Sequence, residues 1–123
     1  MHLSKLDDLR PFTTLDGSTI REIVGPAWTP AANQSLAEAT VQPGGTTTKH
    51  FHRVTEELYF FLRGSGRLTV GDDERDVGPG DCAVIAPGDV HQLVNTGAGP
   101  LVLLCCCAPA YSDEDTVLVD GGS

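Results

Sequence analysis

Basic residues are scarce in this sequence. Its 123 residues include 8 Lys and Arg against 17 Asp and Glu, which gives a formal net charge of −9. Nucleic-acid binding needs clustered Lys and Arg for the phosphates, and docking on an anionic membrane surface needs the same positive charge. A membrane-spanning helix needs about 18 consecutive apolar residues, and no such run is present. We therefore expect neither a nucleic-acid partner nor a membrane partner.

The common cysteine motifs are missing as well. The four cysteines are Cys82, Cys105, Cys106 and Cys107, and no CxxC pair occurs among them. Neighbouring side chains on a strand point to opposite faces, so three consecutive cysteines make a poor disulfide framework. The first residues contain no apolar segment of the kind found in a secretory signal, and we expect a cytoplasmic protein with reduced thiols. Whether a thiol from 105–107 lies near a site or only fills the core stays open.

Helical periodicity is nearly absent, which predicts an all-β fold. Short β-rich runs separated by Gly, Pro and Asp indicate about ten strands. The expected strands are 12–15, 18–24, 35–41, 47–52, 57–62, 67–70, 74–77, 82–85, 90–95 and 101–107, with 116–119 as a possible edge strand. Asp16-Gly17 predicts a type I′ turn in the first hairpin.

A chain of this length forms one domain. We expect it to contain N-terminal strands and a loop that cover a barrel (1–34), the barrel itself (35–110) and an acidic C-terminal tail (111–123). The run 57–62 has two largely apolar faces, so both are expected to be buried. The outer face then needs a cover, either the N-terminal strands or a second subunit, and the second option predicts a homodimer.

Histidine is scarce too, yet three of the four histidines fall at suggestive positions. His2 is read as a surface residue, while His50 and His52 are two apart on an expected strand and therefore face the same side. Glu57 follows on the next expected strand, and His91 opens another one. Three neutral imidazoles and one carboxylate converging inside a barrel would bind a divalent transition metal and leave one or two positions open.

These residues lie in two motifs that resemble those of the cupin family. The first cupin motif, G-x5-H-x-H-x3–4-E-x6-G, is matched by Gly44, His50, His52, Glu57 and Gly64. The second, G-x5-P-x-G-x2-H-x3-N, is matched by Gly80, Gly88, His91 and Asn95. Ala86 stands where the second motif has proline, and Pro87 is its neighbour. The sequence is thus similar to a small single-domain cupin over about residues 35–107.

The resemblance implies a jelly-roll barrel, also called a double-stranded β-helix. It also implies that His50, His52, Glu57 and His91 bind one divalent transition metal ion per chain: Fe, Mn, Ni, Co, Cu or Zn. Glu56 competes with Glu57, but the motif spacing and the parity with Tyr59 and Phe61 favour Glu57.

The expected function is a mononuclear metal-dependent enzyme of oxygenase type that acts on a small polar metabolite. The alternatives are a redox-neutral lyase, isomerase or cyclase, and a non-catalytic small-molecule binding module; the residues leave the catalytic acid or base unidentified. A site that binds metal without any chemistry also stays open. No GxGxxG, Walker loop or GxSxG motif is present, and we expect no nucleotide cofactor.

Three aromatic residues are candidates for a substrate pocket. Tyr59 and Phe61 alternate with Glu57 along the expected strand and therefore face the same side as Glu57. Trp28 lies in a Pro-rich loop that could close over the barrel mouth. Each has an alternative role, because Tyr59 and Phe61 would also serve as core aromatics and Trp28 would also pack at an interface.

Overall fold

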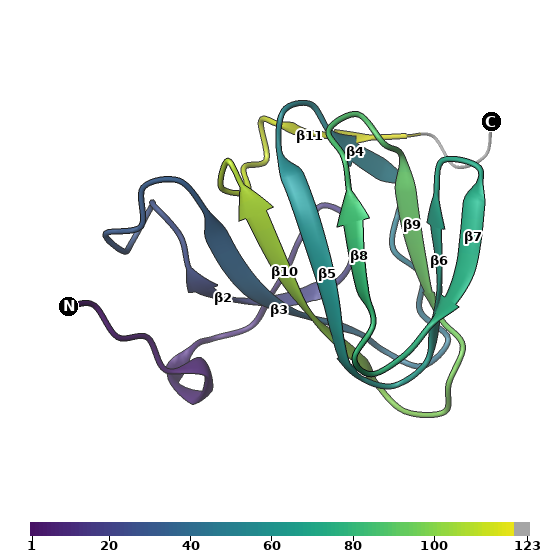
Figure 1. Cartoon of the computed structure of the whole chain (residues 1–123). Helices are drawn as coiled ribbons and strands as arrows, with labels where there is room; N and C mark the ends of the chain where they lie inside the picture. Colours follow the sequence, from purple (N-terminus) through teal and green to yellow (C-terminus); the bar gives the residue numbers. More distant parts are fainter. Residues whose placement is uncertain (120–123) are drawn as a thin grey trace.

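The computed structural model describes residues 1–119 and consists almost entirely of antiparallel strands in two sheets (Figure 1). The six-stranded sheet has the order β1 (Phe12–Thr13), β2 (Thr19–Val24), β3 (Ser35–Val41), β10 (Leu101–Ala108), β5 (Glu56–Arg63) and β8 (Cys82–Ile85). The five-stranded sheet has the order β11 (Thr116–Leu118), β4 (His50–His52), β9 (His91–Asn95), β6 (Gly66–Val70) and β7 (Asp73–Val77). A short 3-10 turn, η1 (Leu6–Asp8), precedes them.

This architecture confirms the all-β jelly-roll prediction. Strands distant in the sequence lie side by side, as when β10 pairs with both β3 and β5 in the middle of its sheet. The expected strand 47–52 is shorter than predicted, since only His50–His52 forms β4, and Thr46 adds an isolated bridge to Val94. The possible edge strand in the tail is present as β11, which pairs with β4, and residues 120–123 of the expected tail lie outside the described part.

The core lies between the two sheets. Its least exposed side chains are Phe61, Ile85, Leu101 and Leu103, each at 0–1% exposure, and they come from three neighbouring strands of the six-stranded sheet. Leu68 and Leu93 join the same cluster from the opposite sheet. One face of each sheet is therefore buried by the other sheet, and polar groups found there need a specific partner.

The first hairpin differs from its predicted geometry. A type I′ turn requires positive φ at both central residues, and among the described residues positive φ occurs only at glycines, Gly17 included. The Gly17 N–H donates to the Thr14 carbonyl and the Thr14 N–H donates to the Ser18 carbonyl, both at 3.0 Å. The connection is thus a three-residue loop, 15–17, with Gly17 in the left-handed region. The type I′ prediction is wrong because Asp16 keeps an ordinary backbone conformation, and this orients its side chain.

The outer face of β5 is not covered within the chain. Phe60 and Leu62 are 41% and 42% exposed, and Val84 on the neighbouring strand β8 is 64% exposed. The N-terminal strands leave this face open because β1 and β2 extend the sheet sideways through β3 instead of packing on it. The predicted burial of both faces of 57–62 is therefore wrong within one chain, while the homodimer stays a prediction.

None of the helical segments described in the chain is long and apolar enough to cross a membrane.

Candidate metal centre

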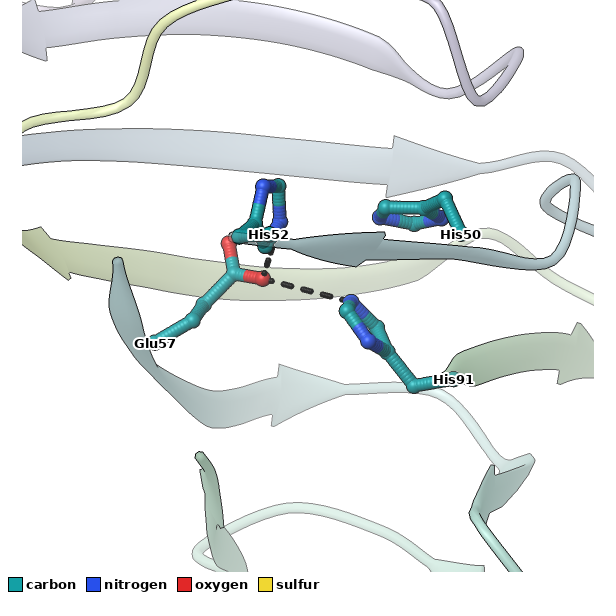
Figure 2. Close-up of side chains that lie close together, drawn as sticks. All are labelled: His50, His52, Glu57 and His91. Atoms are coloured by element: carbon teal, nitrogen blue, oxygen red, sulfur yellow. Dashed lines mark hydrogen bonds and ion pairs between the residues drawn. The ribbon is translucent and has the colours of Figure 1, made fainter. Parts of the chain in front are cut away.

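Three strands bring four polar side chains together inside the barrel. Strand β4 carries His50 and His52, β5 carries Glu57, and β9 begins with His91, which is paired directly with His50. One potential ligand atom from each residue lies within 4.8 Å of the other three, and all four residues are buried (Figure 2). The structure thus gathers the whole predicted set in one place, and Glu56, the rejected alternative, is exposed to solvent.

The tautomers of two imidazoles follow from their backbone partners. His50 Nδ1 lies 2.7 Å from the Thr48 carbonyl oxygen, and His91 Nδ1 lies 2.9 Å from the Asp89 carbonyl oxygen. A carbonyl oxygen only accepts hydrogen bonds, so Nδ1 must donate in both rings. In a neutral imidazole this leaves Nε2 without a proton and with a lone pair directed into the site.

His52 reaches the same state through a side chain. Its Nδ1 lies 3.0 Å from Thr116 Oγ1, and the Thr116 hydroxyl donates its own proton to the Ser112 carbonyl oxygen at 2.9 Å. The hydroxyl oxygen therefore accepts from His52, whose Nε2 is unprotonated in the neutral ring. Hydrogen bonding of the remote ring nitrogen is the usual way in which a metal-binding histidine is oriented.

The resulting arrangement is unfavourable unless a positive charge or a proton lies within it. Glu57 Oε1 is 3.2 Å from His52 Nε2 and 3.4 Å from His91 Nε2, so acceptors face acceptors (Figure 2). Among the described residues, His91 Nε2 is the one fully buried side-chain polar atom that has no hydrogen-bond partner. A divalent ion would satisfy all four groups, and imidazole with carboxylate suits Mn, Fe, Co, Ni, Cu and Zn. The residues therefore fit a transition-metal site.

The charges are also suitable for metal binding. Burial opposes ionisation of Glu57, but contacts with His52 and His91 outweigh it and lower the pKa of its carboxyl from 4.5 to about 2. Burial, together with the nearby His91, lowers the pKa of His50 below its ordinary 6.5. The carboxylate is thus ionised and the His50 imidazole is neutral near neutral pH, which is the form in which each ligates a metal.

A thiol supports the carboxylate from the opposite side. Cys107 Sγ lies 3.3 Å from Glu57 Oε2, and burial raises the pKa of the Cys107 thiol, so S–H remains the donor. Cys105 lies on the same inner face of β10, whereas Cys106 alternates to the outer face. The sequence left open whether one of these three thiols lies near a site or only fills the core. In the structure Cys107 contacts a candidate metal ligand.

A second carboxylate approaches the site from the first hairpin. Asp16 Oδ2 lies 3.7 Å from His50 Nε2, while Asp16 Oδ1 is held by hydrogen bonds within the hairpin. Sequence reasoning missed this residue because Asp16-Gly17 has the composition of a simple turn. The position of the hairpin, and hence of Asp16, depends on the pairing of β2 with β3, which the residue types do not reveal.

A cavity of about 80 Å³ adjoins three of the four residues, His50, His52 and Glu57. Its walls are largely apolar, with Ile20, Ala39, Val41 and Leu103 among the lining residues, and it includes no Lys or Arg from the part of the chain that the structure describes. This volume admits several water molecules or part of a small ligand. Any ligand would therefore meet candidate metal ligands at one side and, elsewhere, walls that are largely apolar but include the Asp16 and Glu22 carboxylates.

The three aromatic candidates lie in different places. Tyr59 is buried and lines the cavity. Phe61 is fully buried in the core and does not belong to the cavity lining found among residues 1–119. Trp28 is 44% exposed in its loop and also lies outside that lining, with its ring centroid 6.0 Å from that of His2.

The fold and this site define a class, a jelly-roll barrel with an interior site of three histidines and one glutamate. The sequence model described as "Cupin domain" matches residues 37–107, and the chain belongs to this family. An uncharacterised protein of Methanocaldococcus jannaschii is 40% identical over 117 residues, which cover 95% of this chain and 94% of that protein.

Solved structures agree on the fold. Oxalate decarboxylase of Lactobacillus farciminis, in a formate complex, superposes with a TM-score of 0.77 and 26% identity. The superposition covers 92% of this chain and 34% of that one, so this chain spans about a third of the decarboxylase chain. The polyketide cyclase RemF of Streptomyces resistomycificus has a TM-score of 0.78 at 24% identity and covers 94% of this chain and 89% of that one.

Proposed function

We propose that this cupin is a mononuclear metal-dependent enzyme that acts on a small polar metabolite. The observation that carries the proposal is the convergence of three buried imidazoles and the Glu57 carboxylate beside a cavity. One divalent transition metal ion per chain is the cofactor that these groups fit. When bound, such an ion polarises a carbonyl or hydroxyl oxygen, or holds a substrate next to oxygen.

Two reaction types could use this centre. An oxygenase, the type first expected from the sequence, needs only the metal ligands and open positions. A redox-neutral lyase, isomerase or cyclase also needs a side chain that moves a proton, and Asp16 offers a carboxylate oxygen 3.7 Å from His50 Nε2. The 26% identity with an oxalate decarboxylase also favours chemistry of this second type. We therefore place redox-neutral chemistry first and oxygenase chemistry second.

The first experiment measures the metal. Elemental analysis of protein purified without added metal should find one transition metal ion per chain. His91→Ala should lose the ion, because it removes an imidazole at the centre of the set, while its circular dichroism spectrum stays unchanged. His2→Ala is the matched control, since His2 is exposed and remote from the set. Full metal occupancy in His91→Ala would show that these residues do not form the site.

The second experiment separates the reaction types. Metal-loaded protein is screened against small carbonyl, hydroxy and carboxylate compounds with and without oxygen. Redox-neutral turnover should persist anaerobically, whereas an oxygenase should stop and should consume oxygen in air. Ligand-induced stabilisation without any turnover would instead indicate the third candidate function, a binding module.

The cytoplasmic location and the absence of nucleic-acid, membrane and nucleotide-cofactor partners remain predictions from the composition and motifs of the chain.

A further inference from the structure

The side chain of Asp16 is held so that one of its two carboxylate oxygens is fixed and the other faces the cavity. Oδ1 accepts hydrogen bonds from the Thr14 hydroxyl at 2.7 Å, the Ser18 N–H at 2.9 Å and the Ser18 hydroxyl at 2.6 Å. Oδ2 accepts none from the residues that the structure describes. Asp16 lines the cavity and has a side-chain exposure of only 15%, so this oxygen is positioned in advance of any ligand.

A polar atom that lies close to Oδ2 is also an acceptor. His50 Nε2 lies 3.7 Å away, and His50 Nδ1 has already donated its proton to the Thr48 carbonyl oxygen. An anionic oxygen and a nitrogen lone pair at this separation repel each other unless a cation or a hydrogen-bond donor joins them. The candidate ion would lie among His50, His52, Glu57 and His91, a set that does not include Asp16. The partner that Oδ2 lacks is therefore a hydrogen-bond donor on a molecule bound in the cavity.

The remainder of the cavity offers little competition for such a group. Apolar side chains such as Ile20 and Ala39 form part of the walls, and the Thr14 and Ser18 hydroxyls that also line the cavity already donate to Asp16 Oδ1. The other carboxylate of the wall, Glu22, has a pKa that burial raises, and it contacts the Trp28 side chain. Among residues 1–119, Asp16 is therefore the carboxylate nearest to the candidate metal ligands apart from Glu57, which is itself one of them.

We propose that Asp16 is a substrate-binding residue, whose Oδ2 accepts a hydrogen bond from a hydroxyl group of a substrate that is also held at the metal centre. The substrate class is accordingly a small hydroxylated compound with an oxygen ligand next to the hydroxyl-bearing carbon. This assignment rests on the proposed function, because it requires the ion. It adds a specificity determinant that neither the metal ligands nor the apolar walls provide.

The test uses two probes that are alike in size and charge. Glycolate has a hydroxyl donor where fluoroacetate has a fluorine that cannot donate. Both are titrated into Co(II)-loaded protein, and binding is followed by the visible spectrum of the ion. The native protein should prefer glycolate by about tenfold or more, as expected for a hydrogen bond to a charged acceptor.

Asp16→Asn is the informative variant because its carbonyl oxygen can keep the three hairpin bonds of Oδ1 while an NH2 group replaces Oδ2. The preference for glycolate should fall to about twofold or less, because the acceptor has become a donor. Fluoroacetate should bind the variant at least as well as the native protein, because the lost carboxylate repels this anion, and Co(II) stoichiometry should stay at one per chain. Glu22→Gln is the matched control, a carboxylate of the same wall without the contact to His50, and it should keep the preference.

The outcomes separate the two proposals. If the native protein fails to bind Co(II), the metal centre and the role of Asp16 are both overturned. If Co(II) binds but the native protein does not distinguish the probes, or Asp16→Asn keeps the preference, the role of Asp16 alone is overturned. Asp16→Ala, which removes the hairpin bonds as well, should also lose the preference, and thermal unfolding of this variant reports any damage to the fold separately.

Discussion

The two faces of β5 have similar composition and opposite surroundings. On the inner face Glu57, Tyr59 and Phe61 are 5%, 4% and 0% exposed, although one of them is a carboxylate. On the outer face Phe60 and Leu62 are more than 40% exposed, although both are large and apolar. Residue type thus does not decide burial along this strand; the layer that packs on each face does.

The difference shows where the chain concentrates its polar interactions. The facing sheet encloses the inner side. There Glu57 lies against three histidines and accepts a hydrogen bond from the Cys107 thiol. The outer side has no second layer among residues 1–119, because β1 and β2 continue the sheet at its edge. The inner face can therefore hold a metal site, and the outer face can pack against a second subunit. Adjacent residues of a strand point to opposite faces, so substituting each of two neighbours in turn tests this contrast.

The largest expected effect comes from the two adjacent phenylalanines. Phe61→Ala should lower the free energy of unfolding by about 3–5 kcal/mol, because it leaves a cavity in the enclosed core. Phe60→Ala should lower it by about 1 kcal/mol or less, because much of that ring is already in water. Denaturant unfolding of both variants measures the difference. Equal losses would mean that the outer face is as tightly packed as the inner one.

The next effect depends on pH and on the two adjacent glutamates. The pKa of Glu57 is lowered from 4.5 to about 2, so the folded chain binds fewer protons than the unfolded chain between these values. The resulting stability is present above pH 4.5 and is lost as the pH falls towards 2, up to about 3 kcal/mol. Protonation of His50, whose pKa is lowered by burial, acts in the same direction below 6.5.

Glu57→Gln should therefore flatten the acid limb of the stability curve of metal-free protein, whereas Glu56→Gln should leave it unchanged, since Glu56 is exposed on the outer side. Unfolding by urea in chelator at a series of pH values measures both curves. A curve that Glu57→Gln does not alter would show that this carboxylate gains nothing from the histidines.

A smaller effect is expected from two adjacent thiols. Cys107→Ala should weaken metal affinity by about tenfold, because the thiol that holds Glu57 Oε2 is lost. Cys107→Ser should restore much of it with a hydroxyl donor, and Cys106→Ala should bind metal like the native protein. Calorimetric titration with Co(II) compares the three. Unchanged affinity in Cys107→Ala would make the thiol a filler of space only.

The smallest effect on the folded chain itself is expected at the exposed face, where the predicted homodimer can be tested. Phe60 and Leu62 on β5 and Val84 on the neighbouring β8 are exposed apolar side chains of the same sheet face, and a second copy would cover them. Light scattering should then find a dimer for the native protein and a monomer for Phe60→Asp, with similar unfolding of the single chain. A native monomer at micromolar concentration would contradict the prediction.

Much of the fold and the four candidate ligands could be predicted, the strands from local patterns and the jelly roll and the complete ligand set from the resemblance to the cupin motifs. Period-two alternation and turn residues place the strands, and the spacing of His50 and His52 fixes their common side. The parity of Glu57 with Tyr59 and Phe61 selected it correctly over Glu56 as the inward-facing carboxylate. These properties follow from a few neighbouring residues.

The remainder depends on contacts between distant segments. Asp16 reaches His50 only because the first hairpin pairs with β3 in a particular register, and a one-residue shift would turn its neighbours to the other face. The exposure of Phe60 depends on the route of the N-terminal strands, which the composition of 57–62 cannot reveal. The support of Glu57 by Cys107 spans 50 residues of sequence.

Because β11 pairs with β4, the C-terminal segment helps to position the side chains of the candidate metal site. Thr116 orients His52 through its hydroxyl, and the Asp115 carboxylate accepts the N–H groups of Val54 and Thr55 immediately after β4. Proteolytic removal of the residues after 110 would therefore leave every candidate ligand in the chain. It would still remove the hydrogen bond that orients the His52 imidazole.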